Sequence, residues 1–367
     1  MIDRVVISGG GTGGHIYPAI AIADEIKKRN PRAKILFIGA SGKMEMEKVP
    51  QAGYKIEGLR IAGFQRNFSF SNFLLPFKIA KSLWKARKLL KKFKPQLVIG
   101  VGGYASGPTL QMANLLNIPT LIQEQNSFPG KTNKWLAKRA KKVCVAYENM
   151  EQFFPSKKIV LTGNPVRKEF YSQEDLRLEG IKYYKLDPAK KIILIIGGSL
   201  GAKTLNRSVV RSIKAIIQAD VQLIWQCGKS YYSNLLEELN GMNMTNIQLM
   251  QFINRMDLAY AAADVIISRA GAISVSELSI VGKPAILVPS PNVSEDHQTQ
   301  NAMALVKKSA AILVRDNEAR EKLFPEALNL INDAEKCETL SKAIKSLEKP
   351  DATQEIVDVC EKIVNHH

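Results

Sequence analysis

The chain has 367 residues, of which 46% are hydrophobic and 23% are charged, so it can bury a sizeable core and is not an intrinsically disordered chain. This length is typical of about two domains. The four cysteines are scattered and form no C-x-x-C pair, which argues against a disulfide framework or a zinc site. That cysteine usage fits a reducing cytoplasm.

The excess of positive over negative charge lies in the first half of the chain. The formal net charge is +18; residues 1–165 contain 27 Lys and Arg against 9 Asp and Glu, whereas residues 166–367 contain 25 of each. No acidic residue occurs between Gly58 and Gln123. Such a one-sided distribution predicts an anionic partner, either nucleic acid, phospholipid or a phosphorylated substrate.

Short apolar runs alternate with helical patterns, which predicts parallel sheets with crossover helices. In the first half, strands are expected at Val5–Ile7, Ile35–Ile38, Leu97–Val101, Thr120–Ile122 and Val143–Val145. After a break at residues 163–165 and a polar stretch, they are expected at Ile192–Ile196, Leu223–Gln226, Ile247–Gln251, Val265–Ser268 and Ala285–Val288. The pattern predicts an α/β chain with two Rossmann-like, doubly wound domains, over residues 1–163 and 164–345. A helix within residues 346–367 is expected to pack back toward the first domain.

Glycine-rich loops follow predicted strands in both halves. The first, Gly9–His15, fits G-x-G-x-x-G and leads into a helix, so its amides and the helix N-terminus can receive a phosphate. No acidic residue ends the second strand to bind a ribose, which argues against NAD or FAD. Similar loops, Gly100–Pro108 and Gly197–Ala202, join a strand to a helix. A tight turn without a ligand is the plainer alternative for the first loop.

A fourth strand–turn–helix segment, Asp264–Glu277, carries a carboxylate soon after the helix begins. Glu277 can accept two hydrogen bonds from the vicinal hydroxyls of a ribose. It can equally do no more than complement the helix dipole. Spacing alone leaves both interpretations open.

Taken together, the motifs resemble those of the bacterial peptidoglycan glycosyltransferases that add N-acetylglucosamine (GlcNAc) to lipid I to make lipid II. They occur in order over almost the whole chain and are specific as a set. The segments that carry the resemblance are residues 10–15, 102–104, 124–126, 132–136, 163–167, 197–202, 269–272 and 296–298.

The resemblance implies the GT-B fold, in which two Rossmann-like domains face each other across a cleft. It places UDP-GlcNAc on the second domain and the lipid acceptor on the first. The implied donor contacts are Thr12, Gly13, Gly14, Asn126, Arg167, Ser199, Ile253, Ala272, Ile273, Ser274, Val275, Ser276, Glu277 and Gln298, with Gln300 as an alternative to Gln298. In this assignment the main chain of Ile253 reads the edge of uracil, and Ser199 and Arg167 support the diphosphate.

The implied reaction is a single displacement with inversion, in which the C4 hydroxyl of the acceptor sugar attacks C1 of GlcNAc and UDP leaves. His15 is the candidate base, because a neutral histidine can take a proton near pH 7. A phosphate contact or a purely structural role is the alternative for His15. Tyr104 and Glu124 are further candidates on the acceptor side. No Asp-x-Asp motif follows an apolar strand, so we expect neither a metal at the diphosphate nor another cofactor.

Residues 64–94 combine aromatic and basic side chains, which predicts attachment to an anionic lipid surface without spanning it. The expected patch comprises Phe68, Phe70, Phe73, Leu74, Phe77, Lys81, Trp84, Lys85 and Lys88. The stripe Ile79, Leu83, Ala86, Leu90 and Phe93 is expected to pack on the sheet instead.

The expected location is the cytoplasmic face of the inner membrane. The expected partners are UDP-GlcNAc, lipid I, that membrane surface and other cell-wall synthesis proteins. A related diacylglycerol glycosyltransferase and a nucleic-acid-binding protein are the alternatives, although no nucleic-acid-binding motif is present.

Overall fold

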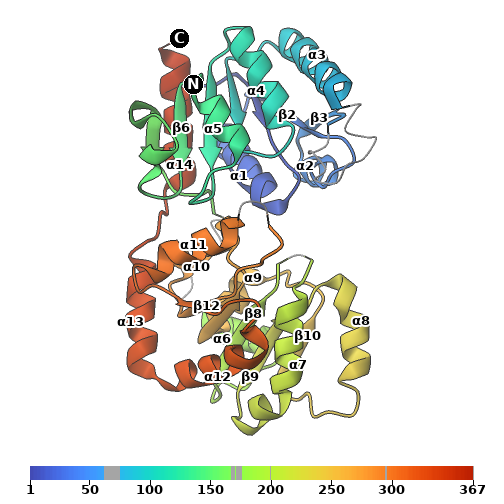
Figure 1. Cartoon of the computed structure of the whole chain (residues 1–367), viewed down its shortest axis with the longest axis vertical. Coiled ribbons are helices and arrows are strands. Elements are labelled where there is room, and N and C mark those ends of the chain that lie inside the picture. The colour runs from blue at the N-terminus through green and yellow to red at the C-terminus, as the bar shows by residue number, and fades with distance from the viewer. Residues whose placement is uncertain (62–74, 167–169, 171–175, 199, 294–295, 367) are drawn as a thin grey trace. The chain divides into compact units, whose positions relative to one another are not determined.

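A computed structural model describes residues 1–61, 75–166, 170, 176–198, 200–293 and 296–366. The chain forms two compact units (Figure 1). Unit 1 contains Met1–Val166 together with Asp351–His367, and unit 2 contains Arg167–Pro350. The chain therefore passes from one unit to the other at two places.

Unit 1 is built on a seven-stranded sheet in which every pairing is parallel, with the order β3-β2-β1-β4-β5-β6-β7. The sequence did not predict the two edge strands β3 and β7, because one carries charged residues and the other has only three residues. The strands are β1 (Arg4–Ser8), β2 (Lys34–Ala40), β3 (Lys55–Leu59), β4 (Leu97–Gly100), β5 (Thr120–Glu124), β6 (Lys142–Val145) and β7 (Ile159–Leu161).

Helices cover both faces of this sheet. One face packs against α1 (Gly13–Arg29), α2 (Glu45–Gln51) and α14 (Ala352–Asn365). The other packs against α3 (Leu75–Phe93), α4 (Ser106–Leu115) and α5 (Lys131–Ala137). Two short 3₁₀ helices, η2 (Met150–Gln152) and η3 (Ser156–Lys158), precede β7.

The helix α14 is an integral part of unit 1. Its Ile356 and Cys360 are fully buried in the core that α1 also lines. Arg29 of α1 binds α14 through charge-assisted hydrogen bonds to Asp358 (2.5 Å) and Glu361 (3.1 Å). Burial and ion pairs together hold the end of the chain against its beginning.

Unit 2 has a six-stranded parallel sheet with the order β10-β9-β8-β11-β12-β13. Its strands are β8 (Ile192–Ile196), β9 (Gln222–Gln226), β10 (Ile247–Met250), β11 (Val265–Ser268), β12 (Ala285–Leu287) and β13 (Ile312–Leu313). Its helices are α6 (Arg177–Tyr183), α7 (Lys203–Gln218), α8 (Lys229–Glu238), α9 (Met256–Ala262), α10 (Ala272–Val281), α11 (His297–Val306), α12 (Ala319–Asn332) and α13 (Ala334–Lys345).

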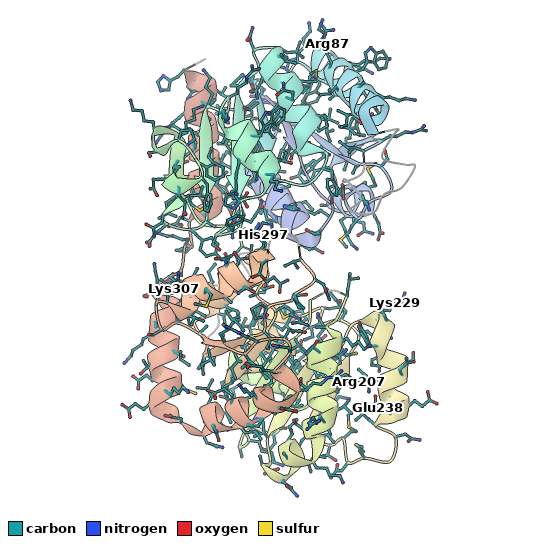
Figure 2. All side chains as sticks on the ribbon, viewed as in Figure 1. Arg87, Arg207, Lys229, Glu238, His297 and Lys307 are labelled. Carbon is teal, nitrogen blue, oxygen red and sulfur yellow. The ribbon has the colours of Figure 1, made fainter. Side chains whose placement is uncertain are left out.

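One core of unit 2 lies between its sheet and the helices α7 and α12. The fully buried Trp225 of β9 and Phe324 of α12 belong to this core. At the surface, Arg207 of α7 and Glu238 of α8 form an ion pair at 2.7 Å, and both are labelled in Figure 2. The predicted pair of doubly wound, Rossmann-like parallel sheets is confirmed.

The strand orders place the glycine loops at a special position. In each sheet the order reverses next to the first strand of the unit, between β1 and β4 and between β8 and β11. Ligands of open α/β sheets bind at such switch points, outside the carboxyl ends of the strands. The loops after β1, β4 and β8 lie at these points.

Candidate active site

The two glycine loops of unit 1 are in direct backbone contact. The N–H of Gly10 donates to the carbonyl of Gly102 at 3.2 Å. Gly102 has φ +92°, a backbone conformation that favours glycine. A Cβ atom at Gly102 would also lie 2.8 Å from His15 Nε2, so a side chain at this position would displace the imidazole.

His15 lies in the first turn of α1, directly over these loops. Its Nδ1 is 3.1 Å from the carbonyl oxygen of Gly10 and 3.3 Å from Oγ1 of Thr12. A carbonyl can only accept a hydrogen bond, so of the two neutral tautomers this contact favours the one that carries its proton on Nδ1. In that tautomer the lone pair of the ring is on Nε2.

Glu45 binds the backbone of the first glycine loop. The sequence analysis did not identify this residue. Its side chain is 1% exposed, although glutamate is rarely buried without a partner. Its carboxylate accepts hydrogen bonds from the backbone N–H of Gly11 (2.8 Å) and Ala40 (2.9 Å). Glu45 thereby ties the loop to the end of β2. No sequence motif marks this role.

Glu124, at the end of β5, is buried and contacts the partly buried Asn126. Glu124 is 2% exposed, and its carboxylate accepts from the side-chain amides of Asn126 (3.1 Å) and Asn133 (2.8 Å). The carboxylate thus orients Asn126, one of the predicted donor contacts. Tyr104, the other predicted acceptor-side residue, is 53% exposed.

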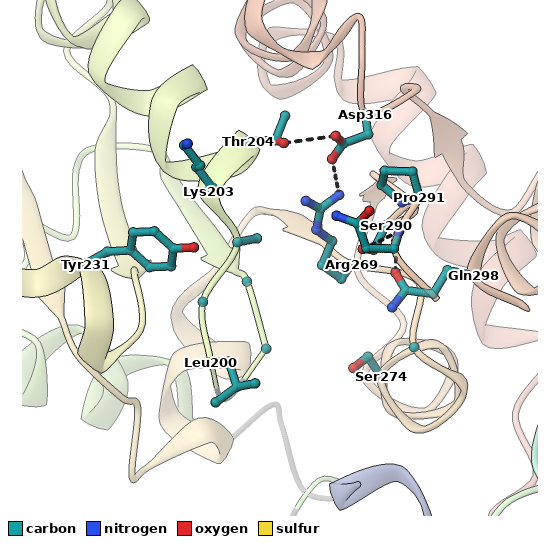
Figure 3. A pocket seen from close by; sticks show the side chains of 16 residues that line it. Leu200, Lys203, Thr204, Tyr231, Arg269, Ser274, Ser290, Pro291, Gln298 and Asp316 are labelled. Carbon is teal, nitrogen blue, oxygen red and sulfur yellow. Dashed lines mark hydrogen bonds and ion pairs between the residues drawn. The ribbon is translucent and has the colours of Figure 1, made fainter. Parts of the chain in front are cut away.

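Unit 2 contains a pocket of about 420 Å³ at its switch point, shown in Figure 3. One wall is formed by Gly197, Gly198 and the segment 200–202, and another by the loop after β12 with the start of α11. Tyr231 of α8 points into the pocket from the side (Figure 3). Gln298 lines the pocket, whereas Gln300 is exposed and is absent from its lining.

A hydrogen-bonded chain crosses the back of this pocket. Asp316 accepts from Arg269 Nη1 at 2.5 Å and from Thr204 Oγ1 at 2.9 Å (Figure 3). The same guanidinium nitrogen donates to the carbonyl oxygens of Val288 (3.0 Å) and Pro289 (3.2 Å). These hydrogen bonds join the start of α7 to the end of β12. The sequence analysis had not identified Thr204 or Asp316 as pocket residues.

The predicted donor contacts at the start of α10 differ in accessibility. Ala272, Ile273, Ser274 and Ser276 are partly exposed, whereas Val275 is buried. Glu277 accepts a hydrogen bond from the hydroxyl of Tyr260 at 3.0 Å. This bond fixes the carboxylate from one side.

Ile253 is 2% exposed, and its N–H donates to Oε1 of Gln226 at 2.9 Å. Because the N–H of Ile253 is engaged by Gln226, its main-chain carbonyl is the backbone group of this residue that can contact a base in the present conformation. The predicted donor contacts Arg167 and Ser199 lie outside the described residues.

The helix α3 carries exposed basic and aromatic side chains. Trp84 is 65% exposed, and the ammonium group of Lys88 lies 5.6 Å from the centre of its ring. Lys81 is exposed, whereas Lys85 donates to the carbonyl of Gly58 at 2.7 Å and is partly engaged. Phe68, Phe70, Phe73 and Leu74 lie outside the described residues, as does the side chain of Phe77.

One expectation for α3 is wrong. Ile79 is 39% exposed rather than packed on the sheet, whereas Leu83, Ala86, Leu90 and Phe93 pack in or against the core on that face as expected. Within the part of the chain that the structure describes, no helix is both long and apolar enough to cross a bilayer.

Two family matches cover most of the chain. Residues 5–145 match the glycosyltransferase family 28 N-terminal domain, and residues 192–356 match the glycosyltransferase family 28 C-terminal domain.

Individual relatives are similar over their whole length. A protein of Flavobacterium psychrophilum is 55% identical over 361 residues, which is 98% of each chain. A protein of Parabacteroides distasonis is 53% identical and covers 99% of this chain and 98% of its own. Both are named UDP-N-acetylglucosamine–N-acetylmuramyl-(pentapeptide) pyrophosphoryl-undecaprenol N-acetylglucosamine transferase.

Solved structures agree with the fold. The crystal structure of Acinetobacter baumannii MurG has a TM-score of 0.78 at 32% identity and covers 98% of this chain and 99% of its own. The structure of S. aureus MnaA with UDP has a TM-score of 0.70 at 14% identity, over 99% of this chain and 97% of its own, and so supports the fold alone.

Proposed function

This chain belongs to glycosyltransferase family 28, and from its full-length similarity we infer that it transfers GlcNAc from UDP-GlcNAc to lipid I. The product is lipid II, the disaccharide precursor of peptidoglycan. The acceptor atom is the C4 hydroxyl of N-acetylmuramic acid on undecaprenyl pyrophosphate. The observation that carries this assignment is 55% identity over 98% of both chains to a relative that is named for this reaction.

The assignment is tested by incubating the purified chain with lipid I or diacylglycerol and with UDP-GlcNAc, UDP-glucose or UDP-galactose. We expect lipid II from the pair lipid I and UDP-GlcNAc alone. Transfer to diacylglycerol in place of lipid I would overturn the assignment. Thermal shift by UDP separates a protein that does not bind the donor from one that lacks the right acceptor.

We assign the role of base to Nε2 of His15. The contact between Nδ1 and the Gly10 carbonyl supports this choice, because it leaves the lone pair on Nε2. The oxygen of the acceptor hydroxyl forms a bond to C1 of GlcNAc, and the bond from C1 to the phosphate oxygen breaks. The hydroxyl proton passes to Nε2, and the electron pair leaves with UDP.

We assign the diphosphate to the pocket of unit 2 and the uridine to Ile253 and Glu277, which are not among the residues that line this pocket. Backbone amides of a glycine loop at the start of a helix are favourable partners for phosphate oxygens. The carbonyl of Ile253 suits the N3–H group of uracil, and Glu277 suits the ribose hydroxyls. Gln298 lines the pocket and is the better candidate than Gln300 for the donor sugar. Thr12, Gly13, Gly14, Asn126, Arg167 and Ser199 remain predicted donor contacts.

The role of His15 is tested by His15→Ala. Loss of the base should lower kcat by on the order of 10²–10⁴ while the Kd for UDP-GlcNAc changes little. Tyr17→Ala, two residues further along the same helix at a position that is 46% exposed, is the control. If His15→Ala binds the donor poorly but turns over normally at saturation, His15 is a binding residue.

We further propose that unit 1 attaches to the cytoplasmic face of the inner membrane through α3. Exposed Trp84 among lysines supports this proposal, because each basic residue near an anionic surface contributes about 1 kcal/mol. Lipid I is itself membrane-bound, so such attachment would bring enzyme and acceptor together. Other cell-wall synthesis proteins are proposed as further partners.

The attachment is tested with vesicles that contain anionic phospholipid. Changing Lys81, Lys88 and Lys92 to Glu should release the protein at low salt while UDP binding persists. Lys85 is left intact because it also contacts the backbone of Gly58. A matched control makes the same charge change at exposed lysines of unit 2, namely Lys214, Lys229 and Lys307. Equal vesicle binding by wild type and both triple variants would show that α3 is not the anchor.

A further inference from the structure

Gln226 is a buried polar side chain that none of the predicted roles includes. It is the last residue of β9 and is 2% exposed. A buried amide must satisfy both its carbonyl and its amino group, and that of Gln226 does so with two different backbone segments. Its Oε1 accepts from the N–H of Ile253 at 2.9 Å, and its Nε2 donates to the carbonyl of Gly198 at 2.9 Å.

The two segments belong to opposite ends of the proposed donor site. Gly198 lies in the glycine loop assigned to the diphosphate and lines the pocket of unit 2, whereas Ile253, the residue assigned to uracil, is not among its lining residues. The loop and the end of β9 are also close in their backbones: a Cβ at Gly228 would lie 2.5 Å from the amide nitrogen of Gly201. Gln226 thus connects the segment that contains Ile253, which we assign to the base, to the glycine loop that contains Gly198, which we assign to the diphosphate.

We propose that Gln226 is a positioning residue that sets both the base segment and the phosphate loop for a uridine diphosphate. This inference rests on the proposed function, since it assumes that unit 2 binds the base at Ile253 and the diphosphate at the glycine loop. Removal of the amide frees the Ile253 N–H and the Gly198 carbonyl, each of which must then move to find another partner. Recognition of base and phosphate should then fail together.

Two variants distinguish the hydrogen bond to Ile253 from the hydrogen bond to Gly198. Gln226→Met removes both hydrogen bonds at nearly constant volume and should raise the Kd of uridine and of UDP by about ten-fold each. Gln226→Glu, measured at pH 8, keeps an acceptor for the Ile253 N–H but no donor for Gly198. It should therefore restore the Kd of uridine to within about two-fold of wild type while UDP remains weak. Because uridine is uncharged, the charge of the new carboxylate cannot account for that rescue.

Gln222 offers a matched control on the same strand. It is also 2% exposed, and its side-chain amide also bridges two backbone groups, the N–H (2.8 Å) and the carbonyl (2.9 Å) of Asp187. Gln222→Met and Gln222→Glu should lower stability without changing either Kd. If they change the Kd values as the Gln226 variants do, the effect is a general loss of packing and the proposal fails.

Three results would overturn the proposal: Gln226→Met binding uridine as wild type does, Gln226→Met binding UDP as wild type does, or Gln226→Glu failing to rescue uridine. Absence of UDP binding to the wild-type chain would instead overturn the proposed function. Hydrogen exchange of the wild-type protein tests these hydrogen bonds even if the Gln226 variants do not fold. The Ile253 amide should be protected from hydrogen exchange before any ligand is added, and rapid exchange there would contradict the bridge.

Discussion

The ion pair between Arg269 and Asp316 should be a main stabilising contact of the unit 2 pocket. Asp316→Asn preserves the shape of the side chain but removes its charge. The asparagine oxygen can accept from Arg269 or from Thr204, and its amino group then faces the other donor. The variant should therefore lose the ionic attraction together with one hydrogen bond.

The exposure of the two side chains sets the size of the effect. Arg269 is 12% exposed and Asp316 is 20% exposed, so the pair lies between a surface pair worth up to about 1 kcal/mol and a buried pair whose disruption costs about 3–5 kcal/mol. We expect Asp316→Asn to lower the free energy of unfolding of unit 2 by about 2 kcal/mol. Thr204→Val removes one neutral donor and should cost about 1 kcal/mol. The double variant should cost less than the sum, because the two residues share one bond.

The tryptophans allow unit 2 to be followed by itself. Trp84 and Trp135 of unit 1 are 65% and 52% exposed, whereas Trp225 of unit 2 is fully buried. With both unit 1 tryptophans changed to Phe, the emission of Trp225 reports the unfolding of unit 2 in urea. A change of less than about 0.5 kcal/mol in Asp316→Asn at an unchanged m-value would refute the reasoning, as would strict additivity with Thr204→Val.

Three further results are expected. Glu45→Gln should lower kcat by on the order of ten-fold in steady-state assays, because glutamine can accept only one of the two N–H groups that hold the first glycine loop; Glu47→Gln on the exposed side of α2 should have no effect. The guanidinium of Arg255 lowers the pKa of Asp257, so this pair stabilises the fold above about pH 4 and loses its contribution as the pH falls through the lowered pKa. Asp257→Asn should thus melt below wild type at pH 7, and this deficit should shrink as the pH is lowered below about 4; a deficit that does not change with pH would contradict the assignment. UDP should bind in calorimetry with excess EDTA, and a loss of binding there would mean that a divalent cation holds the diphosphate.

The sequence predicted the parts of this fold that local signals specify. Apolar runs bounded by glycine loops mark the central strands, and the loops after β1, β4 and β8 lie at the switch points because each directly follows such a run. The edge strands β3 and β7 lack this signal. Their formation depends on pairing with β2 and β6, which no local pattern reports.

The residues that hold the candidate site together could not be predicted in the same way. Asp316 contacts Thr204 across 112 positions of sequence, and Glu45 contacts Gly11 across 34. Each is an ordinary polar residue within its own segment. Only the tertiary fold places it behind a glycine loop or pocket wall. Motif spacing therefore indicates where a ligand can bind but not which side chains support the binding surface.

The return of α14 to unit 1 has a consequence for synthesis on the ribosome. Residues 167–350 form a contiguous unit that can close its core as it emerges. Unit 1 cannot complete its core before unit 2 has been synthesised, because Ile356 and Cys360 pack in the core that α1 lines and follow unit 2 in the sequence. At about 5–20 residues per second, synthesis of unit 2 takes on the order of ten seconds or more, and during this time the apolar face of α1 cannot pack against α14. During that interval the nascent chain presents an apolar strip to which a chaperone can bind.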